Sequence, residues 1–518
     1  MDEIKQTLTK RGFSGNIDDT AATLEKYSHD ASMFEIVPKL VIAPKTVKDV
    51  ETAVKLIADE KKNDASLSLT ARSAGTDMSG AAINDSIIVD FNRYLTEIIS
   101  VKKDIAVTQP GAFFRDFDKA TGDYLLPSYP ASRDLASVGG MVNNNSGGEK
   151  SLEFGKTDKY VPSLKFVFAD GIERVVKPLS RDELNVKMGQ DDFEGKVYKK
   201  LFELIDGRYD QIKAAKPNVS KDSTGYHLWN VWDRKTGIFD LTQAIIGAQG
   251  TLGFVTEATL KLVARPKHSG LLVLFMKDIE DLGELIPKVL GHKPATFESF
   301  DDQTLWLSIK FMPSFLKLLG PARFIRLLLG LIPDGLQLLR GIPKLVLMVE
   351  FTGGTEEEVR GKIRNLHKEL SHVKARYEIN GFEEDPTELA SEKFWIMRRY
   401  SFQLLRSKVK DKHTAPFIDD LIVNPEHLAE FLPKIRAIIK KYKLFATIAG
   451  HVGDGNFHII PLMDIEKESE RAKLLPAMKE VNELVLSYGG SLSGEHNDGL
   501  VRGPWLEQMY GKDMVDLF

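Results

Sequence analysis

The sequence of 518 residues contains no cysteine, which excludes several kinds of chemistry from this chain. Without a thiol there is no disulfide, no thiolate nucleophile and no cysteine-ligated iron–sulfur cluster. Any metal ion must therefore be held by histidine, aspartate or glutamate side chains. An electron relay beyond a bound cofactor must belong to a partner.

Long apolar runs and an excess of charge of one sign are also missing. The N-terminus from Met1 to Lys10 is charged and lacks the apolar core of a signal peptide. No uncharged apolar run reaches the length of a membrane span. The formal net charge of -4 indicates neither a nucleic-acid-binding protein nor an acidic tail. We therefore expect a cytoplasmic protein that does not bind nucleic acid.

The chain is too long for one ordinary core, so we expect two or three domains of mixed helices and strands. Residues 1–34 are predicted to form a helical lead-in. Apolar spacing over residues 46–59 predicts a helix, with Thr46 as N-cap and Asp49 as its capping-box partner. Short apolar runs predict strands at residues 40–42, 87–90, 105–107, 164–168, 174–176, 271–275 and 345–351. The pair 164–168 and 174–176 is predicted to form a hairpin.

One segment, residues 310–344, combines apolar residues with basic ones. Leu, Ile and Phe fill most positions between four prolines, and Asp334 is its one acidic residue. The basic side chains are Lys310, Lys317, Arg323, Arg326, Arg340 and Lys344. Two interpretations stay open: a pair of buried helices, or a basic amphipathic patch that contacts the inner face of a membrane or a partner subunit.

Four stretches in the first half are dense in small residues: 72–80, 130–148, 154–157 and 247–258. Glycine lets the backbone approach a ligand closely, and successive N–H groups can bind a pyrophosphate. None of the stretches has the strand–GxGxxG–helix arrangement or the Gly-Lys-Ser/Thr of the common nucleotide motifs. Each stretch on its own is compatible with a plain turn, but four such stretches in one half of the chain favour a nucleotide-binding site.

These loops resemble the FAD-binding domain of the vanillyl-alcohol oxidase and p-cresol methylhydroxylase (PCMH) superfamily, and in particular its D-lactate, glycolate and D-2-hydroxyglutarate dehydrogenase branch. The resemblance covers residues 35–510. It implies non-covalent FAD, because the first loop lacks the histidine that bonds the flavin in some relatives. It also implies the following cofactor-binding residues: Arg72, Ser73, Ala74, Gly75, Thr76, Asp77, Ser79, Gly80, Pro130, Ser137, Gly139, Gly140, Asn143, Asn145, Gly147, Gly148, Gly155, Thr157, Gly250, Thr251, Gly253 and Val255.

A second motif lies near the C-terminus, where His451 and His458 flank the turn residues Gly453 to Asn456. Such a turn can direct two imidazoles toward one point, and neutral imidazole is a common ligand of divalent metals. Glu495, followed by His496, offers a carboxylate as third ligand. From these residues alone an ordinary turn and a surface pair stay open.

The same resemblance assigns roles to this second motif. It implies that His451, His458 and Glu495 bind a divalent metal (Zn, Mn or Fe), that His496 is the catalytic base and that Asn456 orients the site. The metal would hold the 2-hydroxyl and one carboxylate oxygen of the substrate, and the C2 hydride would pass to the flavin. Arg398, in a Trp-x-x-Arg segment, is the candidate for binding the substrate carboxylate.

The resemblance also has departures. No clear equivalent of the lysine that contacts dicarboxylate substrates occurs near residues 415–420, although Lys412 and His413 lie close by. Relatives continue beyond the point where this chain stops at Phe518, so the catalytic segment is expected to be truncated. The sequence around residues 494–505 is most similar to the branch fused to an iron–sulfur domain, which here would be a separate polypeptide.

The sequence thus predicts an α+β protein with a two-subdomain PCMH-type FAD-binding domain, followed by a ferredoxin-like α+β substrate (cap) domain. The predicted boundaries are 1–34 for the lead-in, 35–266 for the FAD-binding domain, 267–445 for the cap and 446–518 for the metal and catalytic segment. The leading function is an FAD- and metal-dependent D-2-hydroxy-acid dehydrogenase that passes electrons to an iron–sulfur partner or a quinone. An FAD alcohol oxidase and a non-catalytic flavin subunit are the alternatives.

Overall fold

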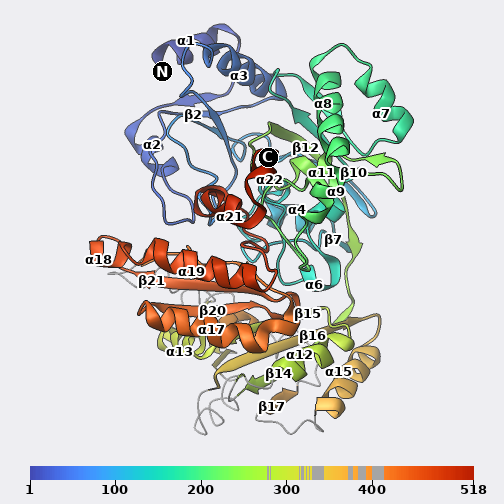
Figure 1. The fold of residues 1–518 in the computed structure, drawn as a ribbon, viewed down its shortest axis with the longest axis vertical. Helices are drawn as coiled ribbons and strands as arrows, with labels where there is room; N and C mark the ends of the chain where they lie inside the picture. The colour runs from blue at the N-terminus through green and yellow to red at the C-terminus, as the bar shows by residue number, and fades with distance from the viewer. Residues whose placement is uncertain are drawn as a thin grey trace.

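The computed structural model describes residues 1–276, 279, 282–313, 316, 320–322, 324–325, 327–328, 343–370, 377–382, 393–398 and 413–518. The chain forms two lobes (Figure 1). The N-terminal half builds the upper lobe and the later part of the chain builds the lower lobe around the largest sheet. Of the basic side chains in the segment 310–344, Lys317, Arg323, Arg326 and Arg340 lie outside the described residues, as does Lys412.

The first sheet of the upper lobe confirms several predicted elements. Its strand order is β1-β2-β4-β3, with β2, β4 and β3 parallel. The bounds are β1 Asn16–Asp18, β2 Leu40–Ala43, β3 Leu69–Arg72 and β4 Ile87–Asp90. Strands β2 and β4 are buried along their whole length, as continuous apolar runs in parallel sheets usually are. Helix α3 (Val47–Glu60) covers this sheet and begins with the predicted capping box of Thr46 and Asp49.

The second sheet of the upper lobe is antiparallel, with the order β5-β6-β12-β8-β9. Its strands are β5 Ile98–Lys102, β6 Ile105–Thr108, β8 Ser163–Val167, β9 Glu173–Val176 and β12 Phe254–Lys261. The predicted hairpin is confirmed by the pairing of β8 with β9. Two short ribbons complete the lobe: β7 (Tyr124–Leu125) pairs with β13 (Val263–Ala264), and β10 (Trp232–Asp233) pairs with β11 (Ile238–Phe239).

The lead-in differs from its prediction as a purely helical segment. Helices α1 (Asp2–Lys10) and α2 (Ala21–Tyr27) are present, but β1 between them pairs antiparallel with β2. Ile4, Leu8 and Phe13 are buried in the same core as β2 and α3. The first residues therefore belong to the upper lobe and extend its first sheet.

The lower lobe is built on an eight-stranded sheet within the described part of the chain. Its order is β17-β14-β16-β15-β20-β21-β18, and β19 pairs with β21. The bounds are β14 His268–Met276, β15 Thr296–Asp301, β16 Leu345–Gly353, β17 Tyr377–Phe382, β18 His413–Thr414, β19 Leu421–Ile422, β20 Phe445–His451 and β21 Asn456–Met463. The sheet includes strands on both sides of residue 445, where the sequence suggested a boundary.

Alternating side chains give this sheet two faces. Leu272, Leu274 and Met276 of β14 join a core formed with α12 (Leu282–Gly291), α15 (Glu356–Leu370), α17 (Leu428–Lys441) and α19 (Leu474–Ser487). Leu271 and Val273 point to the other face, where α13 (Asp302–Lys310) and the helical residues 393–398 pack. Four helices therefore cover one face in Figure 1, and the other face is partly left to the functional site.

The remaining helices are short or belong to the surface of the upper lobe. They are α4 Phe114–Ala120, α5 Val138–Asn144, α6 Ser151–Phe154, η1 Thr157–Tyr160, α7 Arg181–Met188, α8 Phe193–Gly207, α9 Tyr209–Ala214, α10 Leu228–Val231, α11 Thr242–Ile245, η2 Pro425–His427, η3 Val452–Asp454, α18 Glu468–Arg471, α20 Gly499–Arg502, η4 Gly503–Trp505, α21 Leu506–Tyr510 and α22 Lys512–Val515. The chain returns to the upper lobe at its end, where the ring of Phe518 lies 5.9 Å from that of Tyr226.

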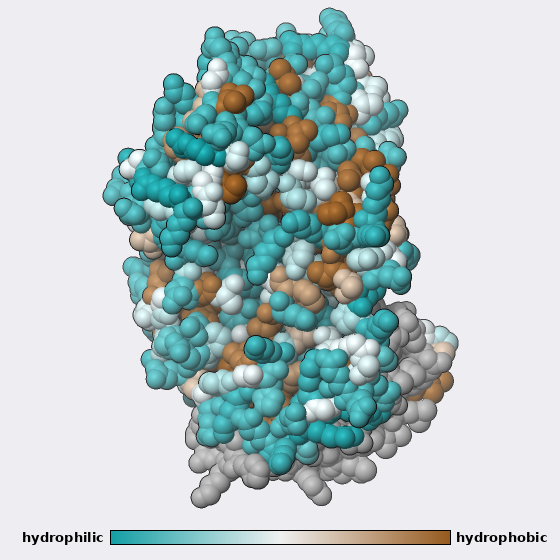
Figure 2. Space-filling model, turned by 90° about the vertical axis from the view of Figure 1, so that its right-hand side faces the viewer, coloured by the Kyte–Doolittle hydropathy of each residue, from teal (hydrophilic) through white to brown (hydrophobic). Residues whose placement is uncertain are grey.

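On the face drawn in Figure 2, hydrophilic residues predominate and apolar ones are scattered among them. Within the described ranges, no helix combines the length and the apolar character that crossing a bilayer requires.

Candidate active site

A cavity of about 590 Å³ is lined by both lobes. The upper lobe contributes three of the four glycine-rich stretches, and the lower lobe contributes α13, Arg398 and the cavity-facing residues of β20 and β21. The loop with Glu495 and His496 completes the wall. The two sets of residues singled out in the sequence therefore meet at one cavity.

Most of the predicted flavin-binding residues line this cavity directly. They are Arg72, Ser73, Ala74, Gly75, Thr76, Asp77, Pro130, Ser137, Gly139, Gly140, Asn143, Gly147, Gly253 and Val255. The others lie behind the lining: Ser79, Gly80, Asn145, Gly148, Gly155, Thr157, Gly250 and Thr251. Thr157, for example, donates to the carbonyl of Ser146 and to Ser128, which fixes the loop from behind.

Two glycines show how closely the chain approaches itself around this cavity. A Cβ on Gly139 would lie 2.4 Å from the Cβ of Pro110, and one on Gly148 would lie 2.3 Å from the carbonyl oxygen of Tyr129. No real side chain tolerates such contacts with neighbouring backbone. Glycine is therefore required at these positions for packing, and not only for flexibility.

The sequence did not single out Asp30 and Ala31, which precede β2 and also line the cavity. They are held there by Arg72, whose guanidinium donates to the carbonyl oxygens of Tyr27, His29 and Ala82. Arg72 is buried, and burial lowers its pKa. The hydrogen bonds of Arg72 therefore hold the segment that closes this side of the cavity, in addition to any role that Arg72 has beside a ligand.

The two motif histidines lie on a β-hairpin, as the turn residues between them predicted. Strand β20 ends at His451, η3 turns the chain, and β21 carries His458 opposite Ala449. Because side chains alternate along a strand, Thr447, Ala449 and His451 face the cavity while Ile448 packs into the helical core. Gly455 adopts a φ of +74°, and a Cβ there would lie 1.8 Å from the carbonyl oxygen of Val423. The tight turn therefore depends on glycine.

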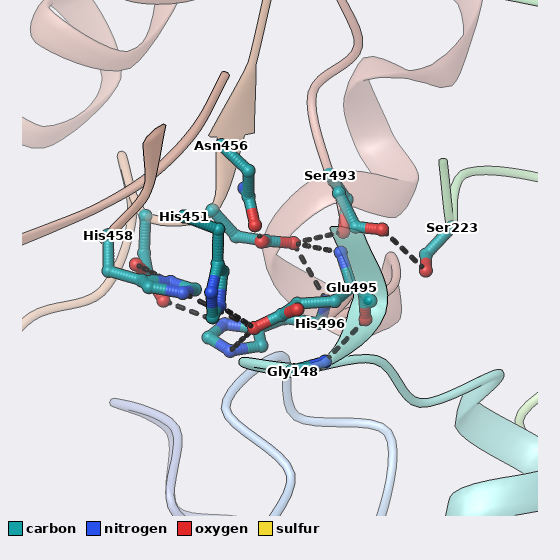
Figure 3. Close-up of polar contacts among 12 residues, drawn as sticks. Gly148, Ser223, His451, Asn456, His458, Ser493, Glu495 and His496 are labelled. Carbon is teal, nitrogen blue, oxygen red and sulfur yellow. Dashed lines mark hydrogen bonds and ion pairs between the residues drawn. The ribbon is translucent and has the colours of Figure 1, made fainter. Parts of the chain in front are cut away.

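Three histidine rings gather around one oxygen of Glu495 (Figure 3). Glu495 Oε1 lies 3.0 Å from His451 Nε2 and 3.3 Å from His458 Nε2. The Nε2 of His496 lies 3.9 Å from the same oxygen, and its ring stacks on that of His458 at 4.8 Å. In the described structure, ligand atoms of Asp420, His458, Glu495 and His496 also fall within 4.8 Å of one another.

Two buried carboxylates that the sequence analysis missed stand behind the histidines. Glu298 of β15 lies 2.5 Å from His451 Nδ1, and Asp419 contacts the Nδ1 atoms of both His458 and His496. The sequence does contain a signal for Asp419, because Asp419 and Asp420 interrupt the apolar run from Ala415 to Val423. Each carboxylate accepts a hydrogen bond from the N–H at Nδ1 and leaves Nε2 directed at Glu495.

The electrostatics of the cluster follow from this mutual contact. Burial acts to lower the pKa of His458, but Asp419 and Glu495 outweigh it and raise that pKa to about 10. Burial also acts to lower the pKa of His496, but Asp420 and Asp419 outweigh it and raise that pKa. Burial acts to raise the pKa of Glu495, yet His451 and Lys221 hold it well below its usual value. The cluster therefore keeps its carboxylates ionised.

Asp420 fixes the backbone of the catalytic loop and does not present an open oxygen. Its Oδ2 accepts the N–H groups of Glu495 and His496 and the hydroxyl of Ser493, and its Oδ1 accepts the amide of Asn456. Asp420 itself has a φ of +65°. Asn456 does not line the cavity, and its hydrogen bond to Asp420 is consistent with the orienting role that the resemblance implied.

The second oxygen of Glu495 is held by the upper lobe. Lys221, which is buried, places its Nζ 2.7 Å from Glu495 Oε2 and 3.8 Å from Asp454 Oδ2. This contact was not foreseen, since no motif around Lys221 distinguished it. Because Oε2 is engaged, Oε1 is the oxygen that Glu495 presents to the histidines.

Arg398 lines the cavity, as expected for a residue that binds a carboxylate. Its Nη2 lies 2.6 Å from Glu298 Oε2, so Glu298 contacts both the guanidinium and His451. Burial acts to raise the pKa of Glu298, but Arg398 and His451 lower it. The orientation of Arg398 is therefore coupled to that of the histidine.

The geometry fits the two groups that the sequence implied. Two imidazole nitrogens and one carboxylate oxygen converge on one point, and Glu298 and Asp419 fix the histidines from behind, as is usual at metal sites. Gly75, Gly139, Gly140 and Gly147 line the other part of the cavity, and glycine-rich loops of this kind commonly bind a pyrophosphate.

Two protein-family models match the chain. Residues 38–176 match the model described as an FAD binding domain, and residues 265–518 match the C-terminal domain of FAD linked oxidases. The D-2-hydroxyglutarate dehydrogenase of Pseudomonas putida is 28% identical over 98% of this chain. The chain spans only 49% of that relative, and about half of the other first curated relatives. The glycolate oxidase subunit GlcD of Bacillus subtilis is 24% identical, over 99% of this chain and 92% of the relative.

Solved structures with the same fold are more distant in sequence. The 4-ethylphenol oxidase from Gulosibacter chungangensis, in complex with isoeugenol, superposes with a TM-score of 0.68 at 14% identity. It covers all of this chain, which in turn covers 93% of that structure. A p-cresol methylhydroxylase with bound substrate gives 0.67 at 14% identity, over all of this chain and 92% of that structure. The predicted fold class is therefore confirmed.

Proposed function

We propose, from the premise that this chain carries the FAD binding domain and the C-terminal domain of FAD linked oxidases, that it oxidises a D-2-hydroxy acid similar to D-lactate to the 2-oxo acid. The observation that carries the proposal is the convergence of His451, His458 and Glu495 with His496 at the FAD-linked cavity. Such a set could hold a metal ion that binds the hydroxyl and one carboxylate oxygen of a 2-hydroxy acid, a pair of ligands that a simple alcohol lacks.

The chain's own residues divide the work of the reaction. His451, His458 and Glu495 would hold a divalent cation, which would supply the positive charge that lowers the pKa of the substrate hydroxyl. His496 takes the hydroxyl proton on Nε2, while Asp419 holds its Nδ1. Arg398 binds the carboxylate and, through Glu298, keeps its orientation relative to His451.

The redox step needs an acceptor for the hydride, in addition to His496 as the acceptor of the proton. FAD, held non-covalently by the loops around Gly75, Gly139 and Gly253, would accept the hydride from C2 of the substrate. Oxidation thus removes one hydride and one proton and leaves a carbonyl group. The 518 residues contain no cysteine, so an iron–sulfur acceptor would have to lie outside them, and a quinone is the other candidate acceptor.

The lining beyond the histidines supports a short, apolar substrate side chain. Apart from Arg398, the described residues of this wall outside the cluster are neutral: Thr304 and Leu307 of α13 and Thr447, Ala449 and Ile460 of the hairpin. A second carboxylate would have to be desolvated against them, which costs free energy unless a charged partner is present.

The test is a flavin-bleaching experiment without oxygen. The purified FAD protein is mixed with D-lactate, D-2-hydroxybutyrate or D-2-hydroxyglutarate, with and without added Zn²⁺ or Mn²⁺. We expect loss of the visible absorbance of oxidised flavin with the monocarboxylates, and no loss after chelation. Bleaching by simple alcohols that survives chelation would instead favour an oxidase, and bound FAD that no substrate bleaches would favour a non-catalytic subunit.

Contact with a membrane surface is a separate proposal, supported by α13 and the residues after it. Trp306 and Ile309 are 43% and 44% exposed on this helix, and Leu316 is 43% exposed. Lys310 lies over the ring of Trp306. Trp306→Ser is expected to reduce co-flotation with anionic vesicles, whereas Leu475→Ser on α19, which removes another exposed apolar side chain, is expected to have no effect. Equal flotation of both variants would contradict this proposal.

A further inference from the structure

Asp419 lies at the centre of the cluster, yet it does not line the cavity. It precedes β19 and its side chain is fully buried. Each of its oxygens contacts a different ring: Oδ1 lies 3.2 Å from His458 Nδ1, and Oδ2 lies 2.8 Å from His496 Nδ1. One carboxylate therefore holds two imidazoles to which the proposed reaction gives different tasks.

This arrangement fixes the tautomer of both rings. An ionised carboxylate has no proton to donate, so each Nδ1 must carry the hydrogen of its bond. Each ring must then bind a metal or exchange a proton through Nε2, the nitrogen that faces Glu495. The two Nε2 atoms lie 3.3 Å and 3.9 Å from Glu495 Oε1, and the rings stack with 20° between their planes.

The carboxylate is itself held rigidly. Arg502 donates one N–H to the carbonyl oxygen of Asp419 at 2.7 Å and another to that of Asn497 at 2.8 Å. The adjacent Asp420 accepts the backbone N–H groups of Glu495 and His496. The loop with Asp419 and the loop with His496 are therefore joined by several bonds, which keep the distance between carboxylate and rings constant.

We propose that Asp419 is a positioning residue shared by the metal ligand His458 and the base His496, so that one side chain sets the tautomer of both. This inference rests on the proposed function, because it presupposes those two tasks. Glu298 has the matching place behind His451, but its second oxygen contacts Arg398 and no second imidazole. The shared role therefore belongs to Asp419.

The replacement Asp419→Asn separates this role from a general contribution to folding. Asparagine has the same shape but offers one acceptor oxygen and one N–H₂ group. Its oxygen can serve only one ring, and the N–H₂ group forces the other to accept on Nδ1, so that its Nε2 carries the hydrogen. The shorter bond to His496 indicates that this ring keeps the oxygen and that His458 loses its ability to bind metal.

The experiment measures Zn²⁺ affinity of metal-stripped, FAD-loaded protein by competition with a chromogenic chelator. Asp419→Asn is expected to weaken binding about 10- to 100-fold. The control Asp454→Asn removes another buried carboxylate near Lys221 that touches no imidazole, and it is expected to change affinity much less. The flavin spectrum reports that each variant has folded and kept FAD.

A double variant supplies the readout that a merely structural role would not move. In His496→Ala the proposed metal ligands are intact, so Zn²⁺ affinity is expected to match that of the unmodified protein. When Asp419→Asn is added, the amide can turn its oxygen to His458, and affinity is expected to return to within about threefold.

The outcomes distinguish the inference from its premise. If the unmodified protein binds no Zn²⁺, the proposed metal site fails. If it binds Zn²⁺ but Asp419→Asn binds equally well, or if removing His496 does not restore the affinity of Asp419→Asn, the metal site stands and the shared role of Asp419 is wrong.

Discussion

The loops that surround the long part of the cavity and the histidine cluster at its end are built from different parts of the polypeptide. The loops present mainly backbone, and their shape depends on glycines packed against other backbone, such as Gly139 and Gly148. The cluster depends on side chains from at least four segments, held by Glu298, Asp419, Asp420 and Lys221. We therefore expect that a side chain of the cluster can be replaced without loss of FAD. A change in the flavin loops, in contrast, should reduce both FAD binding and turnover.

The replacement His496→Ala tests the first half of this comparison and has the largest expected effect. Loss of a general base typically lowers the rate by 10² to 10⁴, so flavin reduction by D-lactate should slow by about that factor while the FAD content stays unchanged. The exposed histidine His427 gives a matched control, His427→Ala, which is expected to reduce flavin at the normal rate. Normal reduction by His496→Ala would show that another group accepts the proton.

The replacement Gly139→Ala tests the second half. The added Cβ would meet Pro110 at 2.4 Å, so the loop must move away from the cavity. We expect the purified protein to retain little FAD, with turnover falling in proportion, and we would measure the ratio of flavin to protein absorbance. Gly207→Ala, at a position where a Cβ meets nothing within 4 Å, should keep a full complement. Full occupancy in Gly139→Ala would mean that the loop does not shape the flavin site.

Arg398→Lys is expected to affect binding more than chemistry. Lysine keeps the charge but loses the planar fork that matches a carboxylate, so KM for D-lactate should rise by about tenfold or more while kcat changes less. Steady-state kinetics with an artificial electron acceptor measure both. A fall in kcat at unchanged KM would instead indicate that Arg398 acts mainly through Glu298 on His451.

The smallest effect is expected at Asp301, which caps α13 by accepting from the N–H of Thr304. Burial raises its pKa to about 6 although Thr304 opposes this. The neutral carboxyl group therefore contributes stability that is fully present below the unfolded pKa of about 4. This contribution is lost as the pH rises through the folded pKa of about 6. Asparagine caps equally well without charge, so Asp301→Asn should gain on the order of 1–2 °C in Tm above pH 6 and nothing at pH 4. A gain that is the same at both values would contradict this assignment.

The two regions also differ in how far the sequence predicted them. The capping box at Thr46, the buried strands of the first sheet and the β20–β21 hairpin follow from local patterns, because spacing and turn residues determine them. The flavin loops could be predicted because their high glycine content is evident from the sequence alone. The lining by Asp30 and Ala31 could not, since it depends on where Arg72 holds the lead-in.

The carboxylates behind the histidines were missed for a related reason. Glu298 and Asp419 are far in sequence from the histidines, and only the sheet order brings them beside His451 and His458. Asn456, in contrast, was found from its motif, but its contact with Asp420 could not be, because that contact depends on the pairing of β19 with β21.

The most direct test of the account is the position of a metal ion in crystals of the FAD-loaded protein grown with Zn²⁺. Anomalous diffraction at the zinc edge should show one peak about 2.0–2.2 Å from His451 Nε2, His458 Nε2 and Glu495 Oε1, with the flavin ring beside it. A peak held by other residues, or none at these three while FAD fills the cavity, would contradict the account.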